Sequence, residues 1–344
     1  MADATQTSAE IERLADWAFA PAKAAIAERR IPGAAFGLVT ASGARAVRFA
    51  GAAQLVPEHL PLTREAWFDL ASLTKVLFTT AKILELADLG RINLDEALTS
   101  AIPDLQQYDQ RAAERRLTFR QCLGHQTHLP AVEPIYTYGS DPQTLRAFVL
   151  QRVWKSGPPV YSDINFILLG IALERLLDIG ICDMPTPEGL TFRPDPANSV
   201  ATERCAWRGR LLCGEVHDEN AYALQGAGHA GLFGTVDGVL DFAQRLMDGT
   251  STPASVVKQL RTRVGGNRTH GWELRFPGWS GGDRCSPATI GHTGFTGTGL
   301  WIDFERGLAW TLLTNRVHPT RHSNSGIVEL RRVTGDLVSA GPSV

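Results

Sequence analysis

The sequence predicts an α+β protein in which helices flank one antiparallel sheet and a mostly helical part is inserted into that sheet. Two observations support this fold class. Strand-like runs occur near both ends of the chain, before residue 51 and after residue 299. The residues between them carry apolar side chains at helical spacing. The economical arrangement is one sheet built from both ends, with a helical insertion.

The N-terminal part predicts a helix followed by a β-hairpin. Residues 9–29 place their apolar side chains close to helical spacing, and the Pro-Gly pair that follows is expected to end the helix. The short apolar runs 34–40 and 44–50 are separated by Ala-Ser-Gly, a sequence typical of a tight turn. We therefore expect these two runs to pair as neighbouring strands.

The middle of the chain is predicted to be mainly helical. Its clearest helix is 72–89, which has one broad apolar face and a glycine directly after it. Residues 183–205 are rich in Pro, Thr, Asp and Asn, and we expect a long loop with a functional or lid-like role. Further helices are expected at 117–123, 142–154, 163–177 and 236–247.

The C-terminal part returns to strands. Residues 300–303 and 308–314 are strand-like, with turn residues between them. We therefore expect a discontinuous sheet domain made of 1–70 and 248–344, and a mostly helical domain, 71–247. The active site is expected between these two domains.

Composition excludes several classes of protein. Of the 344 residues 44% are apolar, enough for a sizeable core, and the net charge of −2 gives no general attraction to nucleic acid or anionic membrane. There is no apolar run of membrane-spanning length and no secretory signal in the opening residues. The five cysteines form no C-x-x-C pair, which favours reduced thiols. We expect a cytoplasmic protein with no membrane or nucleic-acid partner.

Ser72-Leu73-Thr74-Lys75 is an S-x-x-K motif at the start of the clearest helix. Residues three apart share a helix face, so Lys75 can reach the Ser72 hydroxyl. A serine hydroxyl becomes a good nucleophile only when a neighbouring base takes its proton. Taken alone, the motif fits equally a helix-capping serine beside a solvated lysine.

Two further motifs follow in order, and together the three resemble a known family. They are Tyr161-Ser162-Asp163 and His292-Thr293-Gly294. The set is similar to the active-site motifs of the serine hydrolases of the penicillin-binding-protein and class C β-lactamase superfamily. The resemblance covers roughly residues 31–315 and implies a β-lactamase/transpeptidase-like fold.

The resemblance also implies roles for individual residues. Ser72 would be acylated, and Lys75 or Tyr161 would be the base, a choice that the sequence leaves open. His292, Thr293 and Gly294 would form the strand along which substrate lies. The backbone N–H groups of Ser72 and Phe295 would form the oxyanion hole.

Asp163 departs from the family pattern, which has asparagine at this position. An ionised aspartate cannot donate to a substrate carbonyl, so we expect weak or absent β-lactamase activity. Asp163 is also expected to keep Lys75 charged, which would shift the base role to Tyr161.

A metal site is the main competing hypothesis. His125 and His128 are three residues apart, and His217 precedes two acidic residues, with His229 further along the chain. None of these spacings matches an established zinc motif, and no phosphate-binding loop is found. We therefore expect neither a metal nor a cofactor, and structural roles for the histidines.

The sequence thus predicts a serine hydrolase that forms an acyl-enzyme with a small-molecule acyl substrate. Hydrolysis or transfer of small acyl esters is placed first. A D-amino-acid peptidase or amidase related to DD-peptidases is placed second. A sensor that is acylated but does not turn over is the alternative from another class. The oligomeric state is not predicted.

Overall fold

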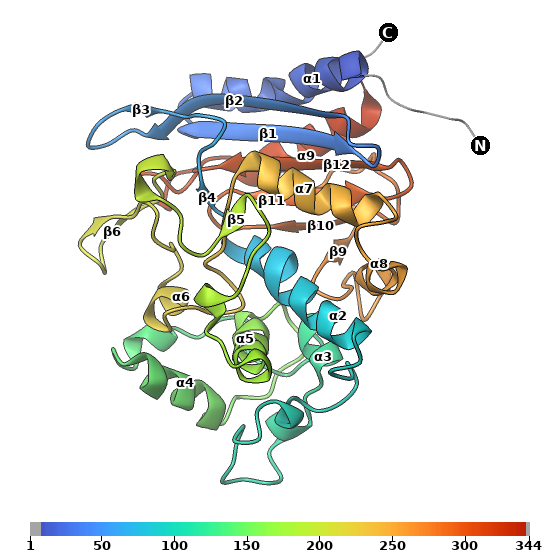
Figure 1. Cartoon of the computed structure of the whole chain (residues 1–344). Coiled ribbons are helices and arrows are strands. Elements are labelled where there is room, and N and C mark those ends of the chain that lie inside the picture. The colour runs from blue at the N-terminus through green and yellow to red at the C-terminus, as the bar shows by residue number, and fades with distance from the viewer. Residues whose placement is uncertain (1–7, 342–344) are drawn as a thin grey trace.

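The computed structural model describes residues 8–341, and its main sheet has seven antiparallel strands (Figure 1). The spatial order is β3-β2-β1-β12-β11-β10-β9, so first and last strands of the chain meet at its centre. The α+β prediction is therefore confirmed. The strands are β1 (Gly33–Thr40), β2 (Arg45–Gln54), β3 (Leu60–Pro61), β9 (Glu273–Leu274), β10 (Ile290–Thr293), β11 (Gly299–Asp303) and β12 (Leu308–Thr314).

Strand β1 joins the two ends of the chain. It pairs with β2, as the hairpin prediction required, and on its other edge with β12, where Ala34 lies opposite Thr314. Because β12 then pairs with β11, the two predicted C-terminal strands are also confirmed. The sheet therefore depends on contacts between residues 280 positions apart, such as 34 and 314.

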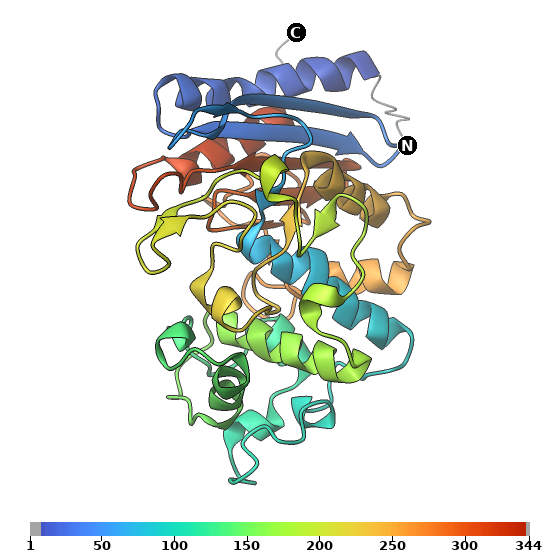
Figure 2. The same ribbon diagram turned by 60° about the vertical axis from the view of Figure 1, so that its left-hand side comes forward.

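Helices cover both faces of the sheet. Alternate side chains of β1, such as Phe36, pack under α1 (Ser8–Ala27) and α9 (Ile327–Ala340), which lie side by side in Figures 1 and 2. The intervening side chains face α7 (Val236–Met247) on the other side. Gly37 permits this close approach, since a Cβ there would lie 2.7 Å from Leu240 Cδ1.

The helical part lies below the sheet in Figure 1 and shares its core. The predicted helical domain, 71–247, includes α7, although α7 packs on the sheet. The division into two domains stays a prediction. The helices of this part are α2 (Ala81–Asp88), α3 (Phe119–Leu123), α4 (Pro142–Gln151), α5 (Asp163–Leu177) and α6 (Glu219–Ala223), and α8 (Ala254–Arg261) packs on α2.

The segment expected to be one helix, 72–89, is irregular. It begins with a 3₁₀ turn at Ala71–Leu73, continues as a π-helix at Lys75–Thr80, and becomes α-helical only in α2. Hydrogen bonds to a neighbouring loop explain the departure: Thr79 Oγ1 donates to Gly228 O, and Thr74 Oγ1 accepts from Leu232 N. Such π-helical turns often occur at functional sites.

The predicted loop 183–205 is mostly irregular but is fastened to its surroundings. Strand β5 (Leu190–Thr191) pairs with β8 (Phe233–Gly234), which also pairs with β4 (Phe68–Asp69). The loop ends in β6 (Arg204–Cys205), which pairs with β7 (Arg210–Leu211). These pairings oppose a freely moving lid.

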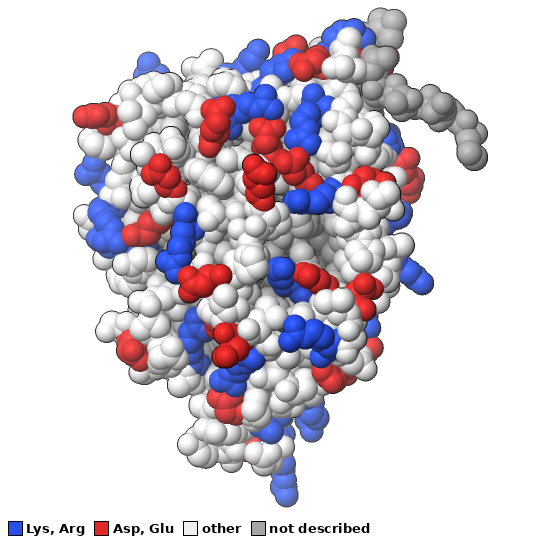
Figure 3. Space-filling model, in the orientation of Figure 1, with Lys and Arg blue, Asp and Glu red and all other residues white. Residues whose placement is uncertain are grey.

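The described surface mixes both signs of charge. On the face shown in Figure 3, Lys and Arg are interspersed with Asp and Glu. Within residues 8–341 no helix is both long and apolar enough to cross a membrane. All five cysteines fall in this range and are free thiols. The opening residues searched for a signal, 1–6, lie outside the described residues.

Candidate active site

Ser72 lies in the 3₁₀ turn, held in reach of Lys75. The Lys75 ammonium donates to Ser72 Oγ at 2.8 Å and to the backbone oxygen of His229 at 3.1 Å. The preceding residue, Ala71, has a φ of 47°, a left-handed conformation that is unfavourable for a residue with a Cβ. This turn presents the half-buried Ser72 side chain at the surface of a cavity.

Two sets of bonds maintain that turn. Asp69, fully buried, accepts from Ala71 N at 2.7 Å and from His217 N at 2.6 Å. The segment after β10 is fastened to the same stretch, because Thr296 and Thr298 donate to the backbone oxygens of residues 69 and 70. Ser72 and Phe295 both line the cavity, and their role as an oxyanion hole stays a prediction.

Asp163 controls the charge of Lys75. The two side chains form an ion pair with Nζ and Oδ1 2.8 Å apart, while the lysine itself has no exposed surface. Burial alone would lower the pKa of Lys75, but the charges of Asp163 and Tyr161 outweigh burial and raise it above its ordinary value. Lys75 is therefore an ammonium at neutral pH and a donor to Ser72.

Tyr161 lies beside this lysine, just before α5. Its ring centroid is 5.0 Å from Lys75 Nζ and 4.9 Å from the guanidinium carbon of Arg268. His125 supports the tyrosine from behind at 4.6 Å between ring centroids, and its Nδ1 accepts from Ser162 N at 3.0 Å. Two cations thus lie next to the aromatic ring of Tyr161.

His292 lies opposite Tyr161, with the ring centroids 5.8 Å apart. Its Nδ1 contacts the backbone oxygen of Thr293 at 3.0 Å, and since that oxygen only accepts, Nδ1 carries the proton. Burial, with Lys75 and Arg268 nearby, holds the pKa of His292 well below its usual range. The neutral ring leaves Nε2 as a buried acceptor without a partner among the described residues.

All eight predicted site residues come together here. Seven of them line one cavity of about 760 Å³, and the eighth, Lys75, lies beneath Ser72. The lining as a whole is unusually charged for a small-molecule site. The charged side chains are Asp163, Asp218, Glu219, Arg268, Glu273, Arg316, Arg321 and Arg331.

A family comparison agrees with this arrangement. Residues 19–332 match the family model described as Beta-lactamase. The chain belongs to the Beta-lactamase family. That assignment confirms the resemblance seen in the three motifs and the β-lactamase/transpeptidase-like fold.

Relatives of this Beta-lactamase family protein differ in activity. It is 28% identical over 316 residues to the N-acetylmuramyl-L-alanine amidase of Bacillus subtilis (strain 168), covering 77% of this chain and 71% of the amidase. A D-alanyl-D-alanine carboxypeptidase-like protein of Escherichia coli (strain K12) is also 28% identical over 316 residues, covering 77% and 72%. The family is one of serine hydrolases, and its relatives do not decide the substrate.

Solved structures share the fold at low identity. A class C β-lactamase superposes with a TM-score of 0.73 at 16% identity, covering 97% of this chain and 98% of that one. Simvastatin synthase (LovD) from Aspergillus terreus gives 0.71 at 19% identity, covering 95% and 97%. These likenesses concern the fold alone.

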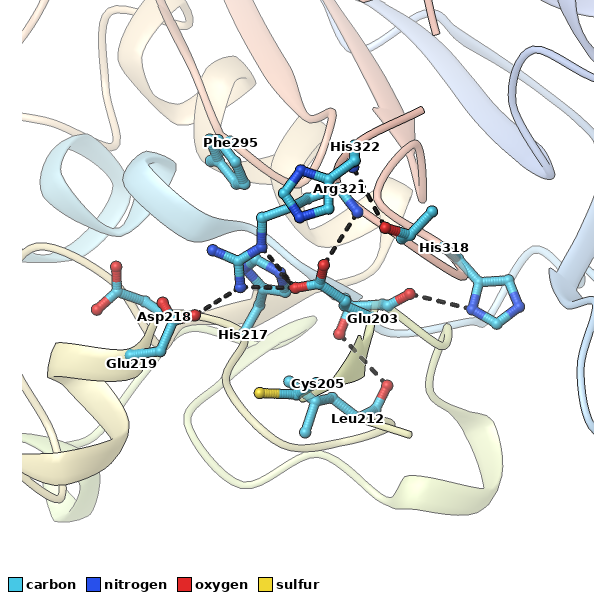
Figure 4. A network of polar contacts seen from close by, with 12 residues as sticks. Glu203, Cys205, Leu212, His217, Asp218, Glu219, Phe295, His318, Arg321 and His322 are labelled. Atoms are coloured by element: carbon cyan, nitrogen blue, oxygen red, sulfur yellow. Dashed lines mark hydrogen bonds and ion pairs between the residues drawn. The ribbon is translucent and has the colours of Figure 1, made fainter. Parts of the chain in front are cut away.

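Sequence analysis missed the charged wall beside Phe295 (Figure 4). In this wall Arg321 bridges Glu203, at 2.6 Å, and Glu219, at 2.5 Å. Glu203 also contacts the ring of His217 at 3.0 Å. His217 and Glu219 are close in sequence, but Arg321 is 102 residues beyond Glu219, and no motif links it to them.

Two arginines of the cavity lack such compensation. Arg316 Nε donates to the Phe295 backbone oxygen at 2.8 Å, and Arg331 Nη2 donates to those of Gly294 and Thr298, both at 2.7 Å. Among residues 8–341 neither arginine forms an ion pair with a carboxylate within 4.0 Å, although the charge of Glu203 acts on Arg316 from further away. Burial, and then the charge of Arg316, lower the pKa of Arg331 to about 9.

The histidines considered as metal ligands have other partners. His128 contacts Glu114, and His229 contacts Asp218 at 2.9 Å. In the part of the chain that the structure describes, no group of three or more His, Cys, Asp or Glu side chains is arranged to hold a metal ion. His125 instead contacts Tyr161.

Proposed function

We propose that this protein hydrolyses an amide bond next to a carboxylate, through an acyl-enzyme on Ser72. The observation that carries the proposal is the pair of guanidinium groups, Arg316 and Arg331, beside Phe295 without a carboxylate partner. Two like charges that form no ion pair at a cavity wall repel each other, and an anion bound between them would relieve that repulsion. A substrate carboxylate supplies that charge, bound close to the oxyanion hole.

The catalytic roles follow from the charges in the site. Tyr161, whose ring lies beside Lys75 and Arg268, acts as the general base and takes the proton of Ser72 while Oγ attacks the carbonyl carbon. The Lys75 ammonium stabilises the developing charge on Oγ. The N–H groups of Ser72 and Phe295 bind the carbonyl oxygen.

The second half of the reaction uses the same groups. Tyr161 returns its proton to the amide nitrogen as the C–N bond breaks, and the amine leaves. A water molecule then attacks the acyl-enzyme, giving one proton to Tyr161, which passes it to Ser72 as the acid departs. No metal or cofactor enters this scheme.

Two of the relatives support an amide substrate. By their names, one acts on the N-acetylmuramyl-L-alanine amide bond and the other is similar to enzymes that cleave D-alanyl-D-alanine. In both types of substrate an amino acid leaves, so a carboxylate can lie near the scissile bond. Small acyl esters, placed first from sequence alone, now come second because the cavity is lined by charge.

The test compares substrates that differ in that carboxylate. Diacetyl-L-lysyl-D-alanyl-D-alanine and N-acetylmuramyl-L-alanine would each be compared with its C-terminal carboxamide, alongside p-nitrophenyl butyrate. We expect the free acids to be preferred roughly tenfold to a hundredfold, as for hydrogen bonds to charged groups, and Ser72→Ala to abolish turnover. In Arg316→Gln the preference should fall towards one. Fast ester release with inert amides would overturn the proposal.

A further inference from the structure

Three aromatic side chains lie together at the surface near the cavity. Trp207, in the turn between β6 and β7, is 4.8 Å from Tyr136 and 5.8 Å from Tyr222 between ring centroids. Trp207 is 48% exposed and Tyr222 is 36% exposed. We name these three residues the aromatic platform; α6, which carries Tyr222, and β6 lie on the same side of the molecule in Figure 1.

The platform is held in place by a buried charge. The guanidinium carbon of Arg208 is 4.1 Å from the Tyr222 ring centroid and 5.5 Å from that of Trp207. The Arg208 side chain is only 2% exposed, and it donates to the backbone oxygens of residues 216, 217 and 218 and to Glu215. Its planar group therefore fixes both rings and the loop beneath them.

The same elements line the cavity. Glu219, which lines it, precedes Tyr222 by three positions on α6 and so lies on the same helix face. The amide of Asn220 donates to Glu133 O at 2.8 Å, and its oxygen accepts from Tyr136 N at 3.1 Å. Val132, next to Glu133 in the chain, also lines the cavity. The segments that carry Tyr136 and Tyr222 therefore each include a residue of the cavity wall.

Polar groups border the exposed rings. Arg210 donates to Glu215 at 2.5 Å and to the Tyr222 hydroxyl at 3.3 Å, and both charged side chains remain partly exposed. A pyranose ring matches this surface, because its C–H face packs on an aromatic ring while its hydroxyl groups reach donors and acceptors at the edge. A purely apolar ligand would remove water from the partly exposed Arg210 and Glu215 without offering them further hydrogen bonds.

We propose that the aromatic platform is a saccharide subsite, which binds a pyranose ring of the substrate whose amide bond is cleaved at Ser72. This saccharide subsite depends on the proposed function only in that the bound sugar belongs to the substrate cleaved at Ser72. The rings are already fixed before any ligand binds, so little ordering opposes the stacking. The substrate class is then an amide with a sugar and a carboxylate.

The test measures binding without turnover. Ser72→Ala protein would be titrated calorimetrically with N-acetylmuramyl-L-alanine and with N-acetyl-L-alanine, which lacks the sugar. We expect the sugar probe to bind more tightly, and Trp207→Ala to weaken it roughly fivefold to tenfold without affecting the sugar-free probe. Trp207→Phe should retain most of the affinity. Trp17→Ala, which removes a comparably exposed ring on α1, should change nothing.

The outcomes separate the two proposals. Equal affinity for the two probes, no binding of the sugar probe, or no effect of Trp207→Ala would overturn the platform. Sugar-dependent binding that Trp207→Ala weakens would support it even if wild-type protein hydrolysed neither amide. In that case the proposed function fails and the saccharide subsite stands.

Discussion

Replacing Asp163 by asparagine tests the electrostatic basis of the site. The change removes one charge and almost no volume, and it restores the residue typical of the family. In the wild-type protein the Asp163 carboxylate, 17% exposed, is 2.8 Å from a lysine with no exposed surface. Lys75 would still donate to Ser72 and to the His229 backbone oxygen.

The loss of stability in Asp163→Asn can be judged from the burial of this ion pair. Removing one partner of a buried ion pair destabilises proteins by about 3–5 kcal/mol, and the partial exposure of Asp163 points to the lower end, about 3 kcal/mol near neutral pH. Because the pKa of Lys75 is raised in the folded protein, the ion pair contributes its full stabilisation below pH 10.5, the ordinary pKa of a lysine. This stabilisation is lost only as the pH rises through the pKa of Lys75 in the folded protein.

In Asp163→Asn burial acts with less opposition, so the pKa of Lys75 falls. Burial is the largest influence on this pKa, so we expect it to fall below 10.5 once the Asp163 charge is removed. The unfolded chain then binds more protons than the folded one, and the variant gains stability as the pH rises towards 10.5. Urea unfolding at several pH values should show a difference from wild type that narrows with increasing pH. The alkaline limb of kcat/KM should also move to lower pH.

A control variant shows whether the loss of stability is specific to Asp163 or follows from replacing any paired aspartate. Asp183→Asn removes the partner of Arg193 at the surface, where both side chains are well exposed. We expect no measurable change in its unfolding midpoint. If Asp163→Asn behaved like this control and kept the wild-type alkaline limb, the argument that Asp163 holds Lys75 charged would be refuted.

Three further predictions concern the site and its support. Nitrocefin should be hydrolysed slowly, since the Asp163 carboxylate accepts but cannot donate; rates typical of a class C β-lactamase would contradict this. Gly37→Ala places a Cβ 2.7 Å from Leu240 Cδ1 and should lower the unfolding free energy by about 1–3 kcal/mol; an unchanged urea midpoint would argue against the tight contact with α7. Asp69→Ala leaves two buried N–H groups unpaired, at about 1–3 kcal/mol each. It should also slow labelling of Ser72 by a fluorophosphonate, and normal labelling would count against its support of the turn.

The sequence by itself determined the family and the fold class, and it predicted the site residues that the structure brings together. The alternation of apolar and polar residues in strands, and helical spacing elsewhere, are local signals that survive in a single chain. Helices α5 and α7 were predicted at their observed bounds, 163–177 and 236–247. Ser72 and Lys75 lie within one turn, so their contact also follows from local geometry.

Only the tertiary structure decided the charges. Whether Lys75 is an ammonium depends on Asp163, 88 positions away, and on burial that no sequence window reports. The local pattern likewise predicts a regular helix for 72–89. In the structure this segment is irregular, and its side chains form hydrogen bonds with the backbone of residues 228 and 232. The same holds for Arg316. Whether it has an ion-pair partner depends on which residues the fold brings close to it. Electrostatic energy depends on distance and solvent exposure in space, and folding sets both.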